Sequence, residues 1–524
     1  ISVGSAFAQK PSKKMLRLFE EAKNLYNQKE YEAAASVLCD CLVFDSTFID
    51  ARLLLADAYY ASDEVLLSAQ TNFNSAVMDS SFHRLYFNAG RQYLQVGCYD
   101  EATEAFSRFI SSNPRNKKTA AVADSLLKAA RVAQSFVENA YPVENLYHDT
   151  LINTDDDEYV NSLTADRKNL YFTRRHHKEG VLNEDVFVAS RNDADDKQFA
   201  SVSDVSQFFS ADKNEAAVSL SPDGNIMFLT VCGSGDSYGS CDIYYSKKIG
   251  DNKWSAIKNL GENVNSAFWD SQPCMSSDSR VLFFASTRPD GYGNSDIWYS
   301  ILNDDGVFLP AKNCGELINT DADELAPYIH YDGQTLYFSS DRYGGLGNLD
   351  LYMVDIQSND TAVNLGFPIN DHENQMNLVI EPNGDRIYTS NYSKETNYDI
   401  ISFDLPEHLK PLTTICKNGL VVDRITKEPI EGAKVDVTNI SQIEDSAFSL
   451  IEDVYNRYSE TNYKGEFTMC LPIDFSYGIT VMAEGYMIYS DCAVMLQDTG
   501  VMYVELDKVE VGTVSIVRNI NFEH

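Results

Sequence analysis

The chain has 524 residues, of which 44% are apolar and 23% charged, a composition typical of folded protein in roughly two to four domains. Lys and Arg number 42 against 78 Asp and Glu, which gives a formal net charge of −36. Phosphate backbones and anionic lipids repel such a chain, so nucleic acid and bare membrane surfaces are poor candidate partners. Basic proteins and cations remain candidates, and solubility alone is the alternative reason for the acidity.

The first residues have the pattern of a signal-peptide end. Ala6-Phe7-Ala8 before Gln9 has the small-residue form that signal peptidase cleaves. We interpret residues 1–8 as a signal-peptide remnant and expect an exported, periplasmic or secreted protein. No Cys follows this site, which argues against a lipoprotein anchor there, and no run of about 20 apolar residues predicts a transmembrane segment.

The ten cysteines are scattered along the chain. No CxxC pair occurs, so the pattern indicates neither a zinc ribbon nor a thioredoxin-like site. Cys232 and Cys241 flank one predicted hairpin loop and would form a disulfide in an oxidising compartment. Two buried free thiols are the alternative, and the spacing leaves both open.

Residues 14–140 are predicted to be helical repeats, because they contain no strand-like alternation and show a period of about 34 residues. Tyr31-Glu32-Ala33-Ala34 matches Tyr99-Asp100-Glu101-Ala102 two periods later. A middle copy is expected to carry one extra residue in its turn and to run through Ala56, Ala69, Phe73 and Ala76. Residues 119–138 are expected to form a closing helix.

This pattern resembles the tetratricopeptide repeat, in which small residues let paired helices approach closely. The resemblance implies an α-solenoid with a concave surface for a peptide or a partner protein. A structural spacer is the alternative.

Residues 146–408 change to short strands separated by turn residues. One unit recurs five times, with Asp or Asn at the turn, an apolar residue four positions later and an aromatic residue five positions later. The turn residues are Asp166, Asp223, Asp278, Asp332 and Asn383. The apolar residues are Leu170, Met227, Leu282, Leu336 and Ile387, and the aromatic residues are Tyr171, Phe228, Phe283, Tyr337 and Tyr388. Units of this length predict four-stranded antiparallel blades, hence a β-propeller.

A second Asp opens the next strand of each unit: Asp185, Asp242, Asp296, Asp350 and Asp399. We expect this Asp to cap the preceding loop by accepting backbone N–H bonds, with a calcium site as the alternative. The segments 286–299 and 339–352 resemble the WD40-like PD40 propeller repeat. The strand at 146–152 would complete the last blade, which predicts five blades, and six is the alternative.

Residues 414–507 read as a further β domain. A strand, a Pro-containing turn, a second strand, the hairpin Gly465-Glu466-Phe467 and the pair Gly485-Tyr486 follow in order. This order resembles the carboxypeptidase regulatory-like domain, a transthyretin-type β-sandwich. The insert 441–460 is long and is expected to have room for a helical turn. Residues 508–524 read as a linker strand towards an absent C-terminal domain.

The order of helical repeats, propeller and sandwich resembles the PorE-like periplasmic proteins of the type IX secretion system in the Bacteroidetes. The resemblance implies a non-catalytic scaffold, associated with the outer membrane, that links outer-membrane secretion components to periplasm or cell wall. Members usually continue into an OmpA-like peptidoglycan-binding domain, which does not occur within these 524 residues, so wall binding is not carried over. Either the precursor was cut or truncated, or this member has no such domain. The alternative is an envelope module that binds a glycan or a peptide on the propeller face.

No catalytic residue, metal ligand or cofactor is predicted. The string Gly235-Asp236-Ser237-Tyr238-Gly239 has the nucleophile-elbow form G-x-S-x-G, but it lies between two predicted strands, where that chemistry needs a strand followed by a helix. His176 and His177 are expected in a basic loop tip rather than in a metal site. The sequence nominates no individual binding residue.

Overall fold

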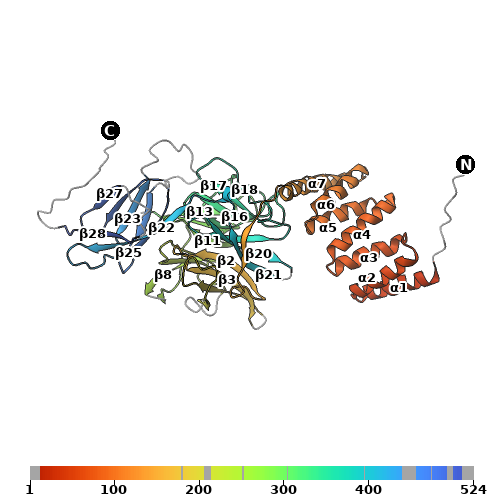
Figure 1. The fold of residues 1–524 in the computed structure, drawn as a ribbon, viewed down its shortest axis with the longest axis horizontal. Helices are drawn as coiled ribbons and strands as arrows, with labels where there is room; N and C mark the ends of the chain where they lie inside the picture. The colour runs from red at the N-terminus through yellow and green to blue at the C-terminus, as the bar shows by residue number, and fades with distance from the viewer. Residues whose placement is uncertain are drawn as a thin grey trace. The chain divides into compact units, whose positions relative to one another are not determined.

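The computed structural model describes residues 12–178, 181–205, 214–250, 253–303, 305–394, 396–439, 456–473, 475–492 and 500–509. A helical repeat region is followed by a β-rich region of several sheets (Figure 1). The chain separates into two compact units, Ile1–Ala140 with Tyr343–Gly347, and Tyr141–Arg342 with Asn348–His524. The predicted signal-peptide remnant and all but two residues of the predicted linker strand 508–524 lie outside the described residues.

Seven α-helices are described in the first unit, and each contacts the next along the series. They are α1 (Lys13–Asn27), α2 (Tyr31–Phe44), α3 (Ile49–Ala61), α4 (Val65–Met78), α5 (Arg84–Gln95), α6 (Tyr99–Ser111) and α7 (Lys117–Glu138), with a 3-10 turn η1 (Ser80–Phe82) between α4 and α5. The expected closing helix at 119–138 is confirmed as α7.

The expectation that the middle repeat carries one extra residue is wrong. The second helices of the three pairs begin at Tyr31, Val65 and Tyr99, so the two steps along the chain are of equal length. Ala34 and Ala102 hold the close-crossing position in the first and third repeats, so the nearest alanine, Ala69, lies one position too late in the middle repeat.

Ser68, and not Ala69, takes the close-crossing position in the middle repeat. Its side chain is buried, and the hydroxyl donates a hydrogen bond to the carbonyl of Ala56 on the facing helix at 2.7 Å. A serine is small enough for this crossing, and its one polar group is satisfied by the helix it touches.

Five antiparallel sheets follow the helices. The first contains β2 (Asp157–Leu163), β3 (Asn169–Lys178), β4 (Val181–Ser190) and β5 (Ser201–Asp204). The second contains β6 (Asn214–Leu220), β7 (Ile226–Cys232), β8 (Cys241–Gly250) and β10 (Lys258–Asn259), with β9 (Lys253–Trp254) also paired to β8. The third contains β11 (Asp270–Met275), β12 (Val281–Ser286), β13 (Asp296–Ile301) and β14 (Lys312–Asn313).

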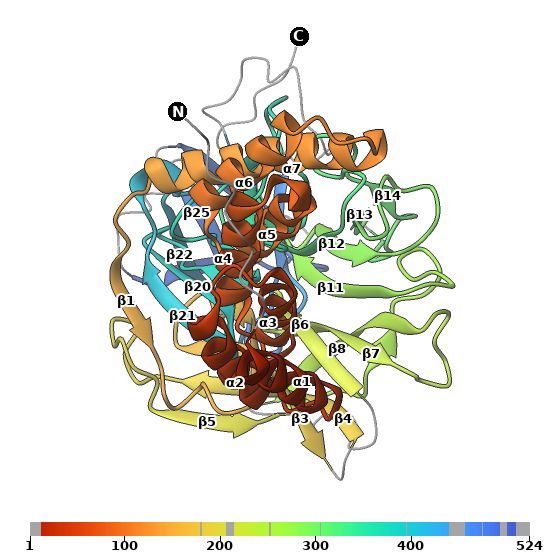
Figure 2. The ribbon, with the colours of Figure 1, turned by 90° about the vertical axis from the view of Figure 1, so that its right-hand side faces the viewer.

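The fourth sheet contains β15 (Glu324–Ile329), β16 (Thr335–Ser340), β17 (Asp350–Asp355) and β18 (Val363–Asn364). The fifth contains β19 (Gln375–Ile380), β20 (Arg386–Ser393), β21 (Asn397–Asp404) and β1 (Glu144–His148), and a 3-10 turn η3 (Glu407–Leu409) follows it. In Figure 2, β7 and β8 lie side by side, and β11 of the next sheet is seen above them.

The five sheets close into a ring. Their first strands β2, β6, β11, β15 and β19 contact one another in that order, and β19 contacts β2 again. Closure also joins the two ends of the segment, because β1 pairs with β21 and supplies the fourth strand of the last sheet. The expected closing strand is thus confirmed, although it spans Glu144–His148 rather than 146–152. Five sheets make up the ring in the described residues.

The predicted turn anchors act as local hydrogen-bond acceptors. In all five hairpins the side-chain oxygen of the anchor accepts the N–H of the residue two positions later, at 2.9 to 3.2 Å. The residue directly after the anchor has a positive φ in every case, and it is glycine in three of them. Asp and Asn favour such turns because their short side chains bond the nearby backbone.

The last domain has two sheets, β25-β22-β28 and β24-β23-β26-β27, which share one apolar core. The strands are β22 (Thr414–Asp423), β23 (Lys434–Asn439), β24 (Asn456–Glu460), β25 (Glu466–Pro472), β26 (Tyr477–Met482), β27 (Tyr489–Cys492) and β28 (Met502–Leu506). A disulfide joins Cys416 on β22 to Cys470 on β25. The end of the insert 441–460 is strand β24. The rest of the insert, residues 441–455, for which a helical turn is expected, lies outside the described residues.

Candidate functional site

Two pairs of apolar side chains are exposed at the ends of α2 and α4. Val43 (82% exposed) and Phe44 (47%) end α2, and Val77 (51%) and Met78 (44%) end α4. The two pairs occupy equivalent positions of successive repeats, and such positions lie side by side in a solenoid. These four exposed residues are called the apolar ridge below.

A chain of hydrogen bonds fixes α4 against α5. Asn72 donates from Nδ2 to Oε1 of Gln92 at 3.0 Å, and Gln92 donates from Nε2 to the hydroxyl of Ser68 at 2.9 Å. Buried polar groups that satisfy one another in this way specify one packing of the helices. We therefore assign the cluster a structural role, which holds the ridge-bearing α4 in place.

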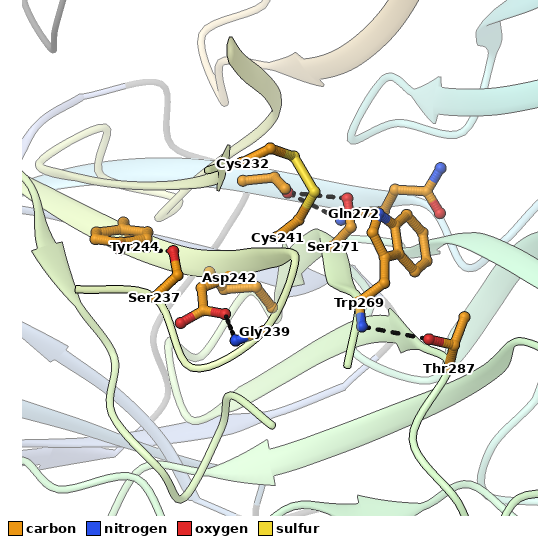
Figure 3. Close-up of a disulfide and its surroundings, with 12 residues drawn as sticks. Cys232, Ser237, Gly239, Cys241, Asp242, Tyr244, Trp269, Ser271, Gln272 and Thr287 are labelled. Carbon is orange, nitrogen blue, oxygen red and sulfur yellow. Dashed lines mark hydrogen bonds between the residues drawn. A yellow bond between two sulfur atoms is a disulfide. The ribbon is translucent and has the colours of Figure 1, made fainter. Parts of the chain in front are cut away.

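In the ring, the loop between β7 and β8 is held by a carboxylate and by a disulfide (Figure 3). The carboxylate of Asp242 accepts the N–H groups of Tyr238 at 2.8 Å and of Gly239 at 3.0 Å. A disulfide between Cys232 and Cys241 joins the two strands at the base of the loop, where these residues are directly opposite. The pairing that the sequence left open is a disulfide in the structure.

The corresponding loop of the third sheet repeats this geometry. Asp296 accepts the N–H groups of Tyr292 at 2.7 Å and of Gly293 at 3.2 Å. The expected capping role of the second Asp is therefore confirmed in these two sheets. Tyr238 and Tyr292 occupy the same place in neighbouring sheets, and each is 51% exposed.

In the first and fifth sheets the second Asp pairs with histidine. His176 Nε2 lies 3.3 Å from Asp185, and His148 Nε2 lies 2.9 Å from Asp399. The expectation that His176 and His177 lie in a loop tip is wrong, because both belong to β3. The first hairpin is longer than the others, with ten residues in each strand, and so takes them into the sheet.

Ser237, the serine of the elbow-like string, lies in the β7–β8 hairpin loop. Its hydroxyl is 3.2 Å from that of Tyr244, and Figure 3 shows the two side chains pointing toward each other. The Tyr244 hydroxyl donates in turn to Asp236 at 2.7 Å. These contacts order the loop, and the turn between two strands lacks the strand-to-helix geometry of a nucleophile elbow.

A pocket of about 300 Å³, which includes open solvent, lies where the inner strands of all five sheets meet. Its polar lining ties sheets together, since Gln272 accepts the N–H of Ala326 at 2.8 Å and Asn377 donates to the carbonyl of Val160 at 3.1 Å. Burial raises the pKa of Cys274 in this lining to about 12, so its thiol stays neutral. These contacts of the pocket therefore serve ring assembly.

A metal site and a membrane-spanning helix are both absent from the residues that the structure describes. Within them, no group of three or more His, Cys, Asp or Glu is placed to hold a metal ion. No helix among the same residues is long and apolar enough to cross a membrane.

Sequence reasoning nominated neither the apolar ridge nor the two tyrosines. Both leave a signal that a repeat comparison finds. Val-Phe at 43–44 recurs as Val-Met at 77–78, and Asp-x-Tyr-Gly at 236–239 recurs at 290–293. Exposure, which distinguishes these residues from core aromatic and aliphatic side chains, is decided by the fold alone.

Comparison with models of known protein families and with curated proteins finds no match. Solved structures resemble only part of the chain. The Yersinia enterocolitica type III secretion chaperone SycD, solved with a peptide of the translocator YopD, is 25% identical with a TM-score of 0.21, covering 24% of this chain and 96% of that one.

PcrH from Pseudomonas aeruginosa is 21% identical with a TM-score of 0.20, over 24% of this chain and 99% of that one. The first tetratricopeptide domain of Spaghetti (RPAP3), bound to an HSP90 peptide, is 16% identical with a TM-score of 0.21, over 24% and 99%. At these TM-scores, no conclusion about this protein rests on the likeness.

Proposed function

We propose that this protein is a non-catalytic scaffold of the cell envelope that binds partner proteins through its helical unit. The observation that carries the proposal is the apolar ridge of Val43, Phe44, Val77 and Met78. These exposed apolar side chains recur at the same place in two successive repeats, and exposed apolar side chains that gather on a folded protein mark interaction sites. A partner that covers the ridge would present an apolar protein segment of its own.

The three architectures support a finer classification. The constant repeat length of the paired helices supports the tetratricopeptide repeat. The closed ring of five sheets supports a five-bladed propeller of the PD40 type. The two-sheet domain with one core supports the transthyretin-type, carboxypeptidase regulatory-like sandwich.

This order of domains supports a place among the PorE-like components of type IX secretion. The partners would then be secretion components of the outer membrane and periplasm, which the chain links to periplasm or cell wall. The location would be periplasmic and outer-membrane associated. Two disulfides agree with an oxidising compartment, because cytosolic reductants keep such thiols reduced.

The test is an affinity pull-down from cross-linked native envelopes, read by mass spectrometry. The wild type is compared with a ridge variant, Val43→Ser, Phe44→Ser, Val77→Ser and Met78→Ser. A control variant, Ile425→Ser and Ile488→Ser, removes apolar side chains that are 83% and 54% exposed in the last domain. Far-UV circular dichroism establishes that the helices remain folded.

The wild type and the control should recover the same outer-membrane secretion components, and the ridge variant should lose them. Recovery of bulk envelope protein alone by the wild type would count against the scaffold. Full recovery by the ridge variant would remove the ridge from the proposal.

A further inference from the structure

We propose that one edge of the ring, at its second and third sheets, binds a Lys- and Arg-rich segment of a protein partner. The residues that carry this inference are exposed, and we call them the Asp–Tyr rim: Asp236, Tyr238, Phe268, Asp290 and Tyr292. The rim belongs to the β unit, and the inference does not rest on the apolar ridge.

The segments that carry the rim contact one another across two sheets. A Cβ at Gly239 would lie 1.7 Å from the carbonyl oxygen of Phe268, so the β7–β8 loop touches the segment that enters the third sheet. The neighbouring Trp269 donates its N–H to the Thr287 hydroxyl at 3.3 Å, at the start of the β12–β13 loop (Figure 3). The loop of Tyr238 thus contacts the segment of Phe268, and that segment contacts the loop of Tyr292.

Both loops are ordered before any partner arrives. The Asp242 and Asp296 carboxylates bind the backbone beside each tyrosine, and the Cys232–Cys241 disulfide closes the first loop. Preorganised aromatic side chains bind at a small entropic cost, because little freedom remains to be lost.

The ring interior already uses the chemistry that the rim would offer. Arg288 lies 5.0 Å from the ring centres of both Phe284 and Trp298, and its guanidinium contacts the Asp270 carboxylate at 2.5 Å. Two further arginines, in the first and fourth sheets, repeat the pairing of guanidinium, carboxylate and aromatic rings: Arg174 and Arg342.

The rim presents the same two partners, a carboxylate and an aromatic ring, on the surface and twice in succession. In each loop the Asp precedes the Tyr by two positions, and both residues are exposed. Asp236 keeps its negative charge while its Oδ1 accepts hydrogen bonds from the hydroxyls of Ser234 and Tyr244. A cation close to such a ring is attracted by its negative face and by the carboxylate together.

Charge decides between a basic protein segment and a neutral glycan, for which exposed rings alone would serve. Residues 1–140 hold 15 Lys and Arg against 16 Asp and Glu, whereas residues 141–524 hold 27 against 62. The field of the β unit therefore attracts cations and speeds their association. A neutral saccharide gains nothing from this field.

The test uses the full chain and a fluorescent synthetic peptide of alternating Arg and Gly, titrated at low and at physiological salt. Tyr238→Ala with Tyr292→Ala removes both rings and leaves the net charge unchanged, so nonspecific attraction is preserved. Tyr503→Ala in the last domain is the matched control, because Tyr503 is also 51% exposed. A chitooligosaccharide is titrated in parallel.

We expect the double variant to weaken peptide binding about 5- to 30-fold, as two exposed cation–aromatic contacts would, while the control binds as the wild type does. Equal binding by the double variant and the wild type would overturn the inference, because the attraction would then be unspecific. Binding of the saccharide in place of the peptide, lost in the double variant, would overturn it in favour of a glycan site.

Discussion

The side chain of Asn153 binds the backbone of Ile400, 247 residues away, at both its N–H and its carbonyl, each at 2.8 Å. Asn265, Asn319 and Asn370 make the same two bonds to the third strands of their own sheets. Asn153 lies just before β2, at the opposite end of the ring segment from Ile400, so it does for the last sheet from a distance what the other three do locally. This contact completes the closure that β1 and β21 begin.

Replacing Asn153 by alanine should destabilise the ring by about 2–4 kcal/mol, because it leaves a buried N–H and a buried carbonyl of Ile400 without partners. Trp254, Trp269 and Trp298 all lie in the ring, so tryptophan fluorescence during urea unfolding reports on this part alone. The exposed Asn27→Ala on α1 is the control and should leave the midpoint unchanged. An unaltered midpoint in Asn153→Ala would show that closure does not depend on this contact.

Gly90→Ala should destabilise the helical unit although alanine favours helices. A Cβ at Gly90 would meet the ring of Phe106 at 2.7 to 2.9 Å, and that ring is fully buried. Overpacking of this kind costs about 1–3 kcal/mol, against a propensity gain of at most about 1 kcal/mol. Thermal unfolding followed by far-UV circular dichroism measures the loss.

A second substitution checks the cause of that loss. The equivalent pair in the first repeat, two periods earlier in the chain, is Ala22 and Leu38. Phe106→Leu in the Gly90→Ala background should therefore restore most of the stability. If the double variant is less stable than either single variant, the crossing geometry is not the reason.

Asp332 should make the ring sensitive to acid. Its buried carboxylate accepts the N–H groups of Gln334, Thr335 and Leu412 at 2.9 to 3.1 Å. Burial acts to raise the pKa of Asp332, but His330 and the hydrogen bonds lower it by a larger amount. The pKa of Asp332 therefore lies well below the usual range for a carboxyl.

A carboxyl whose pKa is lowered by folding stabilises the protein above its unfolded-state pKa, near 4, and loses that contribution as pH falls below it. At pH 7, Asp332→Asn should cost about 2–3 kcal/mol by urea unfolding. The difference between wild type and variant should shrink as pH falls from about 5 towards 3. A difference that is constant over this range would contradict the assignment.

The Cys232–Cys241 disulfide should stabilise the ring by up to about 3 kcal/mol, because it closes a short loop in the unfolded chain. Cys232→Ser with Cys241→Ser should lower the urea midpoint seen by tryptophan fluorescence, and reduction of the wild type should lower it similarly. Peptide mapping without reductant should recover the linked pair. Alkylation of both residues in the unreduced protein would establish free thiols instead.

The features that the sequence predicted correctly are those that depend on neighbours along the chain. The five turn anchors bind a backbone group two positions away, so Asp or Asn at a constant place announces each hairpin. The period of the helical repeats likewise depends on residues within one helix pair and its neighbour along the chain. The change from this period to the recurring strand unit gives the order of the helical and β regions.

Tertiary structure alone decided what depends on distant partners. Ser68 and Ala69 are both small. Only the rotation of α4 about its axis, which turns Ser68 toward Ala56, shows which of the two lies at the helix crossing. The register that places Cys232 opposite Cys241 and the approach of Asn153 to Ile400 are also set by packing across strands. The local sequence pattern therefore predicts which segments are helices and strands. Strand pairing, side-chain exposure and closure of the ring arise only when residues far apart in sequence pack together and exclude water.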